Sequence, residues 1–409
     1  MTTADTGIQL PRGAVAGLSI AAFASGISLR VTDAMLPRLA NDFSLALGDA
    51  AAVITVFAVA YGFAQLLFGP MGDRFGKYRV IALGCIACAF TTASCALAPS
   101  FALLLVARVL AGATAASIIP LAMAWIGDVV PYDRRQPVLA RFLIGQILGV
   151  SAGVLLGGYA ADHLHWRTPF ALIAVIFLVI GSVLLLTNRR LPLAARQRRT
   201  DTGSAIARMG AEFAQILALP WARVVLLTVF AEGAFLYGAF AYMVSHLHQA
   251  HALSLASAGE VVMLFGFGGL LFALAATLLV RRLGEAGLAL WGGLLVCLAF
   301  LVVAWADRWW WSIPACFVAG LGFYMLHNTL QINATQMAPE RRGSAVAAFA
   351  ASFFIGQSVG VAVDGQLIPT IGTTGVIVLG ALGVLLVSLN FSRLKKQRAA
   401  VLQPPPQSP

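Results

Sequence analysis

The sequence predicts an all-α integral membrane protein in which twelve transmembrane helices form two pseudo-symmetric six-helix bundles. Three observations predict this fold class. Of the 409 residues 60% are hydrophobic and only 11% are charged, the apolar residues gather in runs of membrane-spanning length, and the second half repeats features of the first. A water-soluble domain of this size could not hide so much apolar surface.

Twelve apolar runs are long enough to cross a membrane at about 20 residues per helix. Glycine recurs at helical spacing in several of them, which in lipid lets helices approach closely. Residues 1–13 carry little positive charge and Arg30 and Asp33 interrupt the first run, so we expect no cleaved signal peptide. The predicted spans are 14–37, 50–69, 79–98, 101–127, 137–160, 168–187, 222–245, 257–280, 286–305, 311–334, 344–367 and 373–392.

The basic residues are distributed unevenly between the predicted loops. With the N-terminus in the cytoplasm, 22 of the 27 Lys and Arg lie on the cytoplasmic side, as the positive-inside rule requires, so both termini are expected there. They stand in small groups and form no continuous face, so nucleic-acid binding is not expected. The predicted domains are an N-terminal bundle at 1–188, a cytoplasmic linker at 189–220, a C-terminal bundle at 221–393 and a cytoplasmic tail at 394–409.

The two halves repeat each other at a nearly constant offset. A shift of 208 residues lays residues 107–112 on 315–320, and a shift of 211 lays 144–146 on 355–357 and Gly149 on Gly360. Parallel repeats joined by a central linker are the plan of a rocking transporter whose site lies between the halves.

The loop between spans 2 and 3 carries a specific motif. It reads GPMGDRFGKYR, where glycines permit a tight turn and an acid precedes several bases. It resembles the G-x-x-x-D-R-x-G-[RK] signature of the major facilitator superfamily. The matching residues, which the resemblance implies form a cytoplasmic gate, are Gly69, Gly72, Asp73, Arg74, Gly76, Lys77 and Arg79.

Spans 4 and 5 extend the resemblance. Span 4 has small residues every four positions between Arg108 and Asp128, similar to the fourth-helix motif of the superfamily. Span 5 resembles the antiporter motif G-x-x-x-G-P-x-x-G-G, with Val154 in place of the proline. Its matching residues are Gly149, Gly153, Gly157 and Gly158. The resemblance implies the major facilitator fold and is nearest to twelve-helix drug:proton antiporters, while Val154 weakens the antiporter assignment.

Asp33 and Arg30 are the first of the ionisable residues inside the predicted spans. Such residues are costly in a bilayer and need a partner, water or a function. Asp33 is similar in position to the first-helix acids of drug:proton antiporters, and an acid in an apolar cavity can hold a proton and release it when a cation or water arrives. The alternative is an ion pair with Arg30 three residues away, or a solvated acid near the outer mouth.

Three further ionisable residues are candidates for proton coupling or substrate contact. Arg108 can neutralise an acid, bind an anionic substrate or serve as a structural buried charge. Glu232 begins the second half and could face the first helix, although no motif supports it. His327 lies in a locally polar turn of span 10. It is equally consistent with a proton- or ligand-binding group and with a core histidine whose hydrogen bonds are satisfied.

The loop motif also predicts contacts at the membrane face. We expect Arg74 to pair with Asp128 at the end of span 4, and Asp73 to meet the N-terminal end of span 11, where the helix dipole favours an anion. Such contacts would hold the cytoplasmic side closed in the outward-open state. The second-half loop at 280–285 keeps a basic pair but lacks the acid, so this closure is expected to be asymmetric.

Other site chemistry is not expected. All five cysteines fall inside apolar runs and are interpreted as core residues. His246, His248 and His251 have no carboxylate or thiolate partner in sequence, so we predict no metal site. Without a phosphate-binding loop or a hydrolase motif, we predict no cofactor and no enzymatic activity.

The function that best fits these features is secondary active transport. We predict proton-coupled export of small amphipathic or drug-like molecules by alternating access, in a multi-pass monomer of a bacterial inner membrane whose partners are substrate, protons and lipid. The alternative is uptake or exchange of a small organic anion or metabolite at Arg30 and Arg108. A non-transporting membrane receptor is a remote third interpretation.

Overall fold

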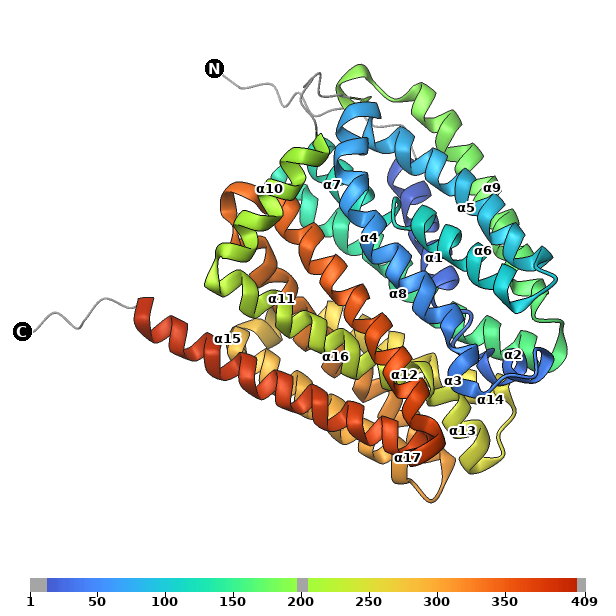
Figure 1. Cartoon of the computed structure of the whole chain (residues 1–409). Helices are drawn as coiled ribbons and strands as arrows, with labels where there is room; N and C mark the ends of the chain where they lie inside the picture. The colour runs from blue at the N-terminus through green and yellow to red at the C-terminus, as the bar shows by residue number, and fades with distance from the viewer. Residues whose placement is uncertain (1–12, 197–204, 403–409) are drawn as a thin grey trace, which may run out of the picture.

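A computed structural model describes residues 13–196 and 205–402, and this part of the chain is helical, with no β-strand. Figure 1 shows the first-half helices, in blue to green, grouped on one side and the second-half helices, in yellow to red, on the other. The first half comprises α1 (Ala14–Arg30), α2 (Leu36–Asp42), α3 (Leu47–Ala50), α4 (Ala52–Phe75), α5 (Lys77–Leu97), α6 (Phe101–Ala115), α7 (Ile119–Val129), α8 (Tyr132–His163) and α9 (Arg167–Arg190).

Two elements connect the halves, the short 3-10 helix η1 (Leu193–Arg196) and the amphipathic helix α10 (Ala205–Ala218), which the polar linker composition did not predict. The second half comprises α11 (Pro220–Glu232), the π-helical turn η2 (Gly233–Tyr237), α12 (Gly238–Ala241), α13 (Met243–His251), α14 (Leu255–Val262), α15 (Leu264–Trp305), η3 (Trp309–Trp311), α16 (Ser312–Met337), η4 (Pro339–Arg341) and α17 (Arg342–Leu402).

Within the described residues, nine helical stretches are long and apolar enough to cross a membrane. Two of them contain a residue with non-helical backbone, Gly284 in α15 with φ 63° and Gly372 in α17 with φ 67°. Only glycine adopts such angles readily, and each glycine falls between two predicted spans. When these two stretches are divided at the glycines and the shorter apolar helix α1 is added, the helices lie at the positions of the twelve predicted spans. The count of twelve membrane crossings stays a prediction.

Glycine ladders bring the first and fifth spans of each half together. A methyl group at Gly145 would lie 2.5 Å from the carbonyl oxygen of Ser19, and one at Gly149 would lie 2.2 Å from that of Phe23. The second half repeats this contact 211 residues later, since methyl groups at 356 and 360 would lie 2.0 Å from the carbonyl oxygens of residues 230 and 234. The internal repeat predicted from the sequence is therefore a structural repeat.

The other motif glycines of α8 continue the ladder. Methyl groups at Gly153 and Gly157 would lie 2.8 Å and 2.1 Å from carbonyl oxygens of the first span. Gly158 points the other way, where a methyl group would lie 2.4 Å from the carbonyl oxygen of Leu255 in the second half. The motif predicted in span 5 thus lets α8 contact α1 on one side and α14 on another.

The first span is interrupted between α1 and α2, where residues 31–35 form turns. Pro37 follows this interruption and has no backbone N–H, so the carbonyl of Asp33 cannot accept the usual helical hydrogen bond. The fourth span breaks between α6 and α7 in the same way, with Pro120 four residues beyond Ala116. Interrupted spans are typical of substrate and ion sites in transporters.

The halves contact each other from the middle of the bundle to the end predicted to be external. Among the hydrogen bonds that cross between them there are Ser358 Oγ to the Thr55 carbonyl at 2.9 Å, Ser151 Oγ to the Met263 carbonyl at 3.0 Å, and the Ala256 amide to Asp162 Oδ2 at 2.6 Å. Gly48 and Gly365 meet backbone to backbone at the same end. The division of the chain into two six-helix bundles, and the boundaries of those bundles, stay predictions.

Candidate functional site

Asp33 lies in the interruption of the first span. Its amide bonds to the carbonyl of Arg30 at 3.2 Å, a three-residue turn that replaces the α-helical pattern. Arg30 Nη1 donates to Asp33 Oδ2 at 3.3 Å, and each residue is only 1% exposed. Among the described residues, the other oxygen, Oδ1, is buried without a hydrogen-bond partner. An unsatisfied buried carboxylate oxygen is a natural place for a proton.

Arg30 connects this carboxylate to the second half. Its Nη2 donates to Gln357 Oε1 at 3.1 Å, and its guanidinium carbon lies 3.7 Å from the centre of the Tyr237 ring, within cation–π range. Gln357 comes from α17 and Tyr237 from η2, so one side chain from the first half contacts two elements of the other. The Arg30–Asp33 ion pair, which the sequence offered as the alternative to a free proton-binding acid, is therefore present, and it lies at the junction of the halves.

Arg108 is held inside the first half. Its Nε donates to the Val53 carbonyl at 3.1 Å, its Nη1 to the Ser28 carbonyl at 3.2 Å, and its Nη2 reaches Thr32 Oγ1 at 3.5 Å. The guanidinium also lies 4.1 Å from the ring centre of Phe57. These contacts join α1, α4 and α6, so of the two intramembrane arginines Arg30 faces the second half and Arg108 does not.

Glu232 and His327 form a second buried acid–base pair. Glu232 Oε2 lies 2.8 Å from His327 Nδ1, Glu232 is fully buried and the histidine side chain is 18% exposed. Glu232 Oε1 has no partner in the described part of the chain. The pair stands directly before the π-helical turn η2, a feature that is common at functional sites. Two residues that the sequence only named separately are thus in contact.

An aromatic cluster lies between the two pairs. The Tyr237 ring makes edge-to-face contacts with Phe240, Phe265, Phe323 and Phe353 at centroid distances of 5.5–6.4 Å. The His327 ring packs on Phe323, Phe349 and Phe353 at 5.0, 5.4 and 4.6 Å. No sequence pattern distinguishes these aromatics from lipid-facing ones. Gln357 was not predicted either, and its only signal in the sequence is its place in the repeated Ile-Gly-Gln segment.

The gate motif forms a triad at the predicted cytoplasmic end. Lys77 Nζ lies 2.8 Å from Asp73 Oδ1 and 2.8 Å from Asp128 Oδ2. The structure therefore pairs Asp128 with Lys77 instead of the expected Arg74, whose guanidinium lies 5.2 Å from the ring centre of Phe75. Lys77 takes this position because it begins α5 next to the end of α7. Asp73 and Asp128 both pair with Lys77 of the first half. These ion pairs do not include the expected contact of Asp73 with the N-terminal end of span 11.

The motif glycines differ in their roles. Gly76 has φ 91° and separates α4 from α5, which only glycine does without strain. Gly72 packs against α7, since a methyl group there would lie 2.6 Å from Leu121 Cδ2, whereas no heavy atom lies within 4 Å of one at Gly69. Arg79 is exposed one turn into α5.

Two of the three histidines at the predicted outer side have separate partners. His246 is buried, with Nδ1 3.0 Å from Thr373 Oγ1 and Nε2 3.1 Å from the Val303 carbonyl. His248 Nδ1 lies 2.6 Å from the Leu253 carbonyl. In the described residues, His, Cys, Asp and Glu form no group of three that could hold a metal ion.

Comparison with known proteins identifies the family. The family profile of the Major Facilitator Superfamily matches residues 18–361. The chain belongs to the major facilitator superfamily. The resemblance inferred from the loop motif is confirmed, and with it the all-α fold class and a multi-pass protein of the membrane. The superfamily comprises transporters of small molecules, so the chain belongs to a family of transporters.

The curated relatives are distant. The MFS-type transporter YceJ of Bacillus subtilis is 23% identical, over 84% of this chain and 86% of its own length. YwfA of the same organism is 26% identical over 61% of this chain and 60% of its own length. The multidrug export protein EmrB of Escherichia coli K12 is 28% identical over 49% of this chain. The matched region spans only 39% of EmrB.

Solved structures share the fold over almost the whole chain. A crystal structure of the peptide transporter POT superposes with a TM-score of 0.76 at 17% identity and covers 96% of each chain. A bacterial homologue of the human lysosomal transporter Spinster, in an inward-facing and unoccupied conformation, gives a TM-score of 0.72 at 17% identity, over 96% of this chain and 98% of that one. At this identity the likeness establishes the fold alone.

Proposed function

We propose that this protein is a proton-driven exporter of small amphipathic or drug-like molecules that works by alternating access. The observation that carries the proposal is the buried Asp33 carboxylate, joined through Arg30 to Gln357 of the second half. A proton on Asp33 would change a contact on which the relative position of the halves depends. Consistent with this proposal, one relative is named a multidrug export protein and another, from Aspergillus flavus, a probable efflux pump.

The coupling step follows from electrostatics. While ionised, Asp33 attracts Arg30 and holds the guanidinium where it also bonds Gln357. Protonation removes one charge of a buried pair, and because unpaired buried charges are costly, Arg30 then seeks other partners and the contact between halves loosens. Moving one proton through about 100 mV releases ~2.3 kcal/mol, enough for roughly a fifty-fold substrate gradient at 1.36 kcal/mol per tenfold change.

The other site residues have supporting roles in this scheme. Arg108 fixes the residues before Asp33 through Ser28 and Thr32, so it sets the position of the carboxylate. Glu232 and His327 are a second place for a proton or a cationic group, next to the aromatic cluster. The Lys77 triad belongs to the cytoplasmic gate. The proposal includes a single-chain transporter in a bacterial inner membrane with both termini in the cytoplasm.

The alternative, transport of an organic anion, has weaker support. It needs guanidinium groups free to receive a carboxylate or phosphate. Three donors of Arg108 are directed at groups of its own bundle, and Arg30 already contacts a carboxylate and an amide oxygen. Both arginines are therefore engaged within the protein.

The decisive experiment measures proton movement that depends on substrate. The purified protein is reconstituted in proteoliposomes containing the pH indicator pyranine, and a panel of amphipathic dyes including ethidium and Hoechst 33342 is added. Asp33→Asn keeps the size of the side chain but cannot carry the proton, so dye-driven proton movement is expected to be lost while dye binding persists. Asp307→Asn, in an exposed loop, is the matched control and should behave as wild type.

Two results would contradict the proposal. Proton movement in Asp33→Asn equal to wild type would remove Asp33 from the coupling role. Accumulation of organic anions inside the vesicles, abolished by Arg30→Gln, would favour the anion alternative.

A further inference from the structure

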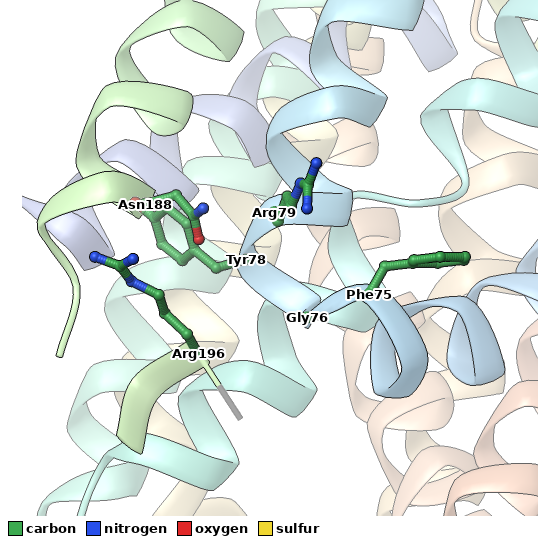
Figure 2. A pocket seen from close by; sticks show the side chains of 6 residues that line it. All are labelled: Phe75, Gly76, Tyr78, Arg79, Asn188 and Arg196. Atoms are coloured by element: carbon green, nitrogen blue, oxygen red, sulfur yellow. The ribbon is translucent and has the colours of Figure 1, made fainter. Parts of the chain in front are cut away.

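A small pocket lies apart from the Arg30–Asp33 pair, at the predicted cytoplasmic end of the first half. It is formed where α4, α5, α9 and η1 meet (Figure 2). The residues that line it are Phe75, Gly76, Tyr78, Arg79, Asn188 and Arg196. Its polar groups are thus two guanidinium groups, an amide and a phenol, and no acid is among the six, so the pocket is suited to an anion.

The walls of this pocket are fixed by hydrogen bonds to the core of the bundle. The indole of the buried Trp125 donates to the Ala195 carbonyl at 3.0 Å, which holds η1 against α7. Tyr78 Oη donates to the Ala14 carbonyl at 3.2 Å. The positive φ of Gly76 turns the chain from α4 into α5 at the floor of the pocket. A pre-organised site loses little conformational entropy when it binds.

Both arginines present part of their side chains to solvent at the edge of the pocket. Arg196 is partly exposed, and its Nη2 donates to the Arg189 carbonyl. Its Nε is buried and, within the described part of the chain, has no hydrogen-bond partner. Arg79 is exposed on α5. In Figure 2 Tyr78 lies between them, with Asn188 and Arg196 on one side and Arg79 on the other. Guanidinium groups bind phosphate oxygens through paired hydrogen bonds.

The surface beside the pocket is apolar and exposed. On α5, Leu83 lies one turn beyond Arg79 and is 46% exposed, and Phe90 two turns further is 69% exposed. On α9, which packs against α5, Val183 and Leu186 are 46% and 57% exposed just before Asn188. In a membrane these side chains face lipid tails. The pocket therefore lies at the depth of the lipid headgroups, and the exposed face of α5 and α9 lies at the depth of the acyl chains.

We propose that this pocket binds the phosphate group of an anionic phospholipid. Arg79, Arg196 and Asn188 hold the headgroup, and the exposed face of α5 and α9 holds the acyl chains. Because η1 leads into the connection between the halves, a bound lipid fastens the start of that connection to the first half. This inference needs neither the proposed substrate nor the proposed direction of transport.

The test uses the full-length protein purified in detergent and native mass spectrometry. Equal amounts of phosphatidylglycerol and phosphatidylcholine are offered, and the lipids retained are counted. Wild type is expected to retain phosphatidylglycerol selectively. Arg79→Gln and Arg196→Gln should each weaken its retention about fivefold, the effect of one basic group near an anionic headgroup. The control is Arg281→Gln with Arg282→Gln, an exposed basic pair in α15 near the kink at Gly284, which should leave retention unchanged.

Further arms separate the sources of phosphate and guard against misfolding. Glycerol 3-phosphate and inorganic phosphate are added as competitors, and displacement of the lipid by either at equal concentration would assign the pocket to a soluble anion instead. Arg79→Lys, which keeps the charge on an exposed residue, should retain more lipid than Arg79→Gln. Equal phosphatidylglycerol retention by wild type and all the pocket variants, or an equal loss in the control, would overturn the proposal.

Discussion

Arg30 combines three contacts that a different cation could not make together. Its planar fork reaches the Asp33 carboxylate and the Gln357 amide oxygen with separate nitrogens, while its face lies on the Tyr237 ring. Lysine is a compact point charge without a planar face, so it would keep at most part of this set. The residue that links the halves is therefore specified by shape as well as by charge.

The Glu232–His327 pair makes a prediction that does not depend on transport. Glu232 is fully buried and bonded to the imidazole at 2.8 Å. His327→Leu leaves that carboxylate without its partner, and breaking a buried pair in this way costs about 3–5 kcal/mol. Removing both groups in Glu232→Leu with His327→Leu should be less harmful than removing the histidine alone. Thermal unfolding in detergent, followed by tryptophan fluorescence, measures the difference.

His246→Leu is a comparison for the single and double variants at 232 and 327. His246 is also buried, but its partners are a hydroxyl and a backbone carbonyl instead of a carboxylate. Its loss should therefore cost less than that of His327. If the double variant at 232 and 327 proves less stable than His327→Leu alone, the pair is held together by packing and the electrostatic argument fails.

At the residue scale, the sequence could predict neighbours along the chain but not partners across it. The Arg30–Asp33 pair followed from a separation of three residues. The contact of Arg30 with Gln357 joins residues 327 positions apart, and no local pattern encodes it. Lys77 took the place expected for Arg74 because the turn at Gly76 decides which base faces Asp128, and side-chain direction at a helix start depends on that geometry.

At the element scale, small residues decide how closely the helices pack. Gly149 of α8 lies against the backbone of Phe23 in α1, and a methyl group there would be only 2.2 Å from a carbonyl oxygen. Backbone cannot move aside as a flexible side chain can. The sequence predicted this ladder because the glycines recur every four residues. It did not predict η2 or the helix α10, since neither a π-turn nor an amphipathic linker helix has a strong local signature.

Gly149→Ala tests the ladder. Forcing the added methyl group between α1 and α8 is expected to cost about 1–3 kcal/mol, as overpacking of a tight core does. Gly127→Ala is the matched control, because no heavy atom lies within 4 Å of a methyl group at that helical glycine, and there alanine should be neutral or slightly stabilising. The fraction of monodisperse protein after heating reports the effect. If Gly149→Ala and Gly127→Ala leave the same fraction of monodisperse protein after heating, α1 and α8 can move apart at little cost.

At the scale of the whole molecule, contacts between the halves are concentrated toward one end. The hydrogen bonds of Ser151, Ser358 and Asp162 to the opposite half all lie between the middle of the bundle and the predicted outer end. A transporter that alternates between two openings must break such contacts in its other state. The internal repeat predicts two bundles. It does not predict the end at which they close, because that depends on the free-energy difference between two conformations of the same sequence.

Asp162 makes a contact whose removal should shift that balance. Its Oδ2 accepts a hydrogen bond at 2.6 Å from the amide of Ala256, in the first turn of α14, so an acid of the first half caps a helix of the second. Loss of a capping side chain costs about 0.5–2 kcal/mol, and this cap exists only while the predicted outer end is closed. Asp162→Ala is therefore expected to raise the population open at that end by about tenfold at 1.4 kcal/mol.

Spin labels at Asn41→Cys and Gln249→Cys, both exposed near that end, report the opening as a longer distance in pulsed electron resonance. The five native cysteines are buried, so labelling is confined to the introduced pair. Asp42→Ala is the control, because its carboxylate pairs with Arg38 of the same half and its loss leaves the contact between halves intact. A distance distribution unchanged by Asp162→Ala, or shifted equally by Asp42→Ala, would mean that this cap does not hold the halves together and that closure rests on the other contacts between them.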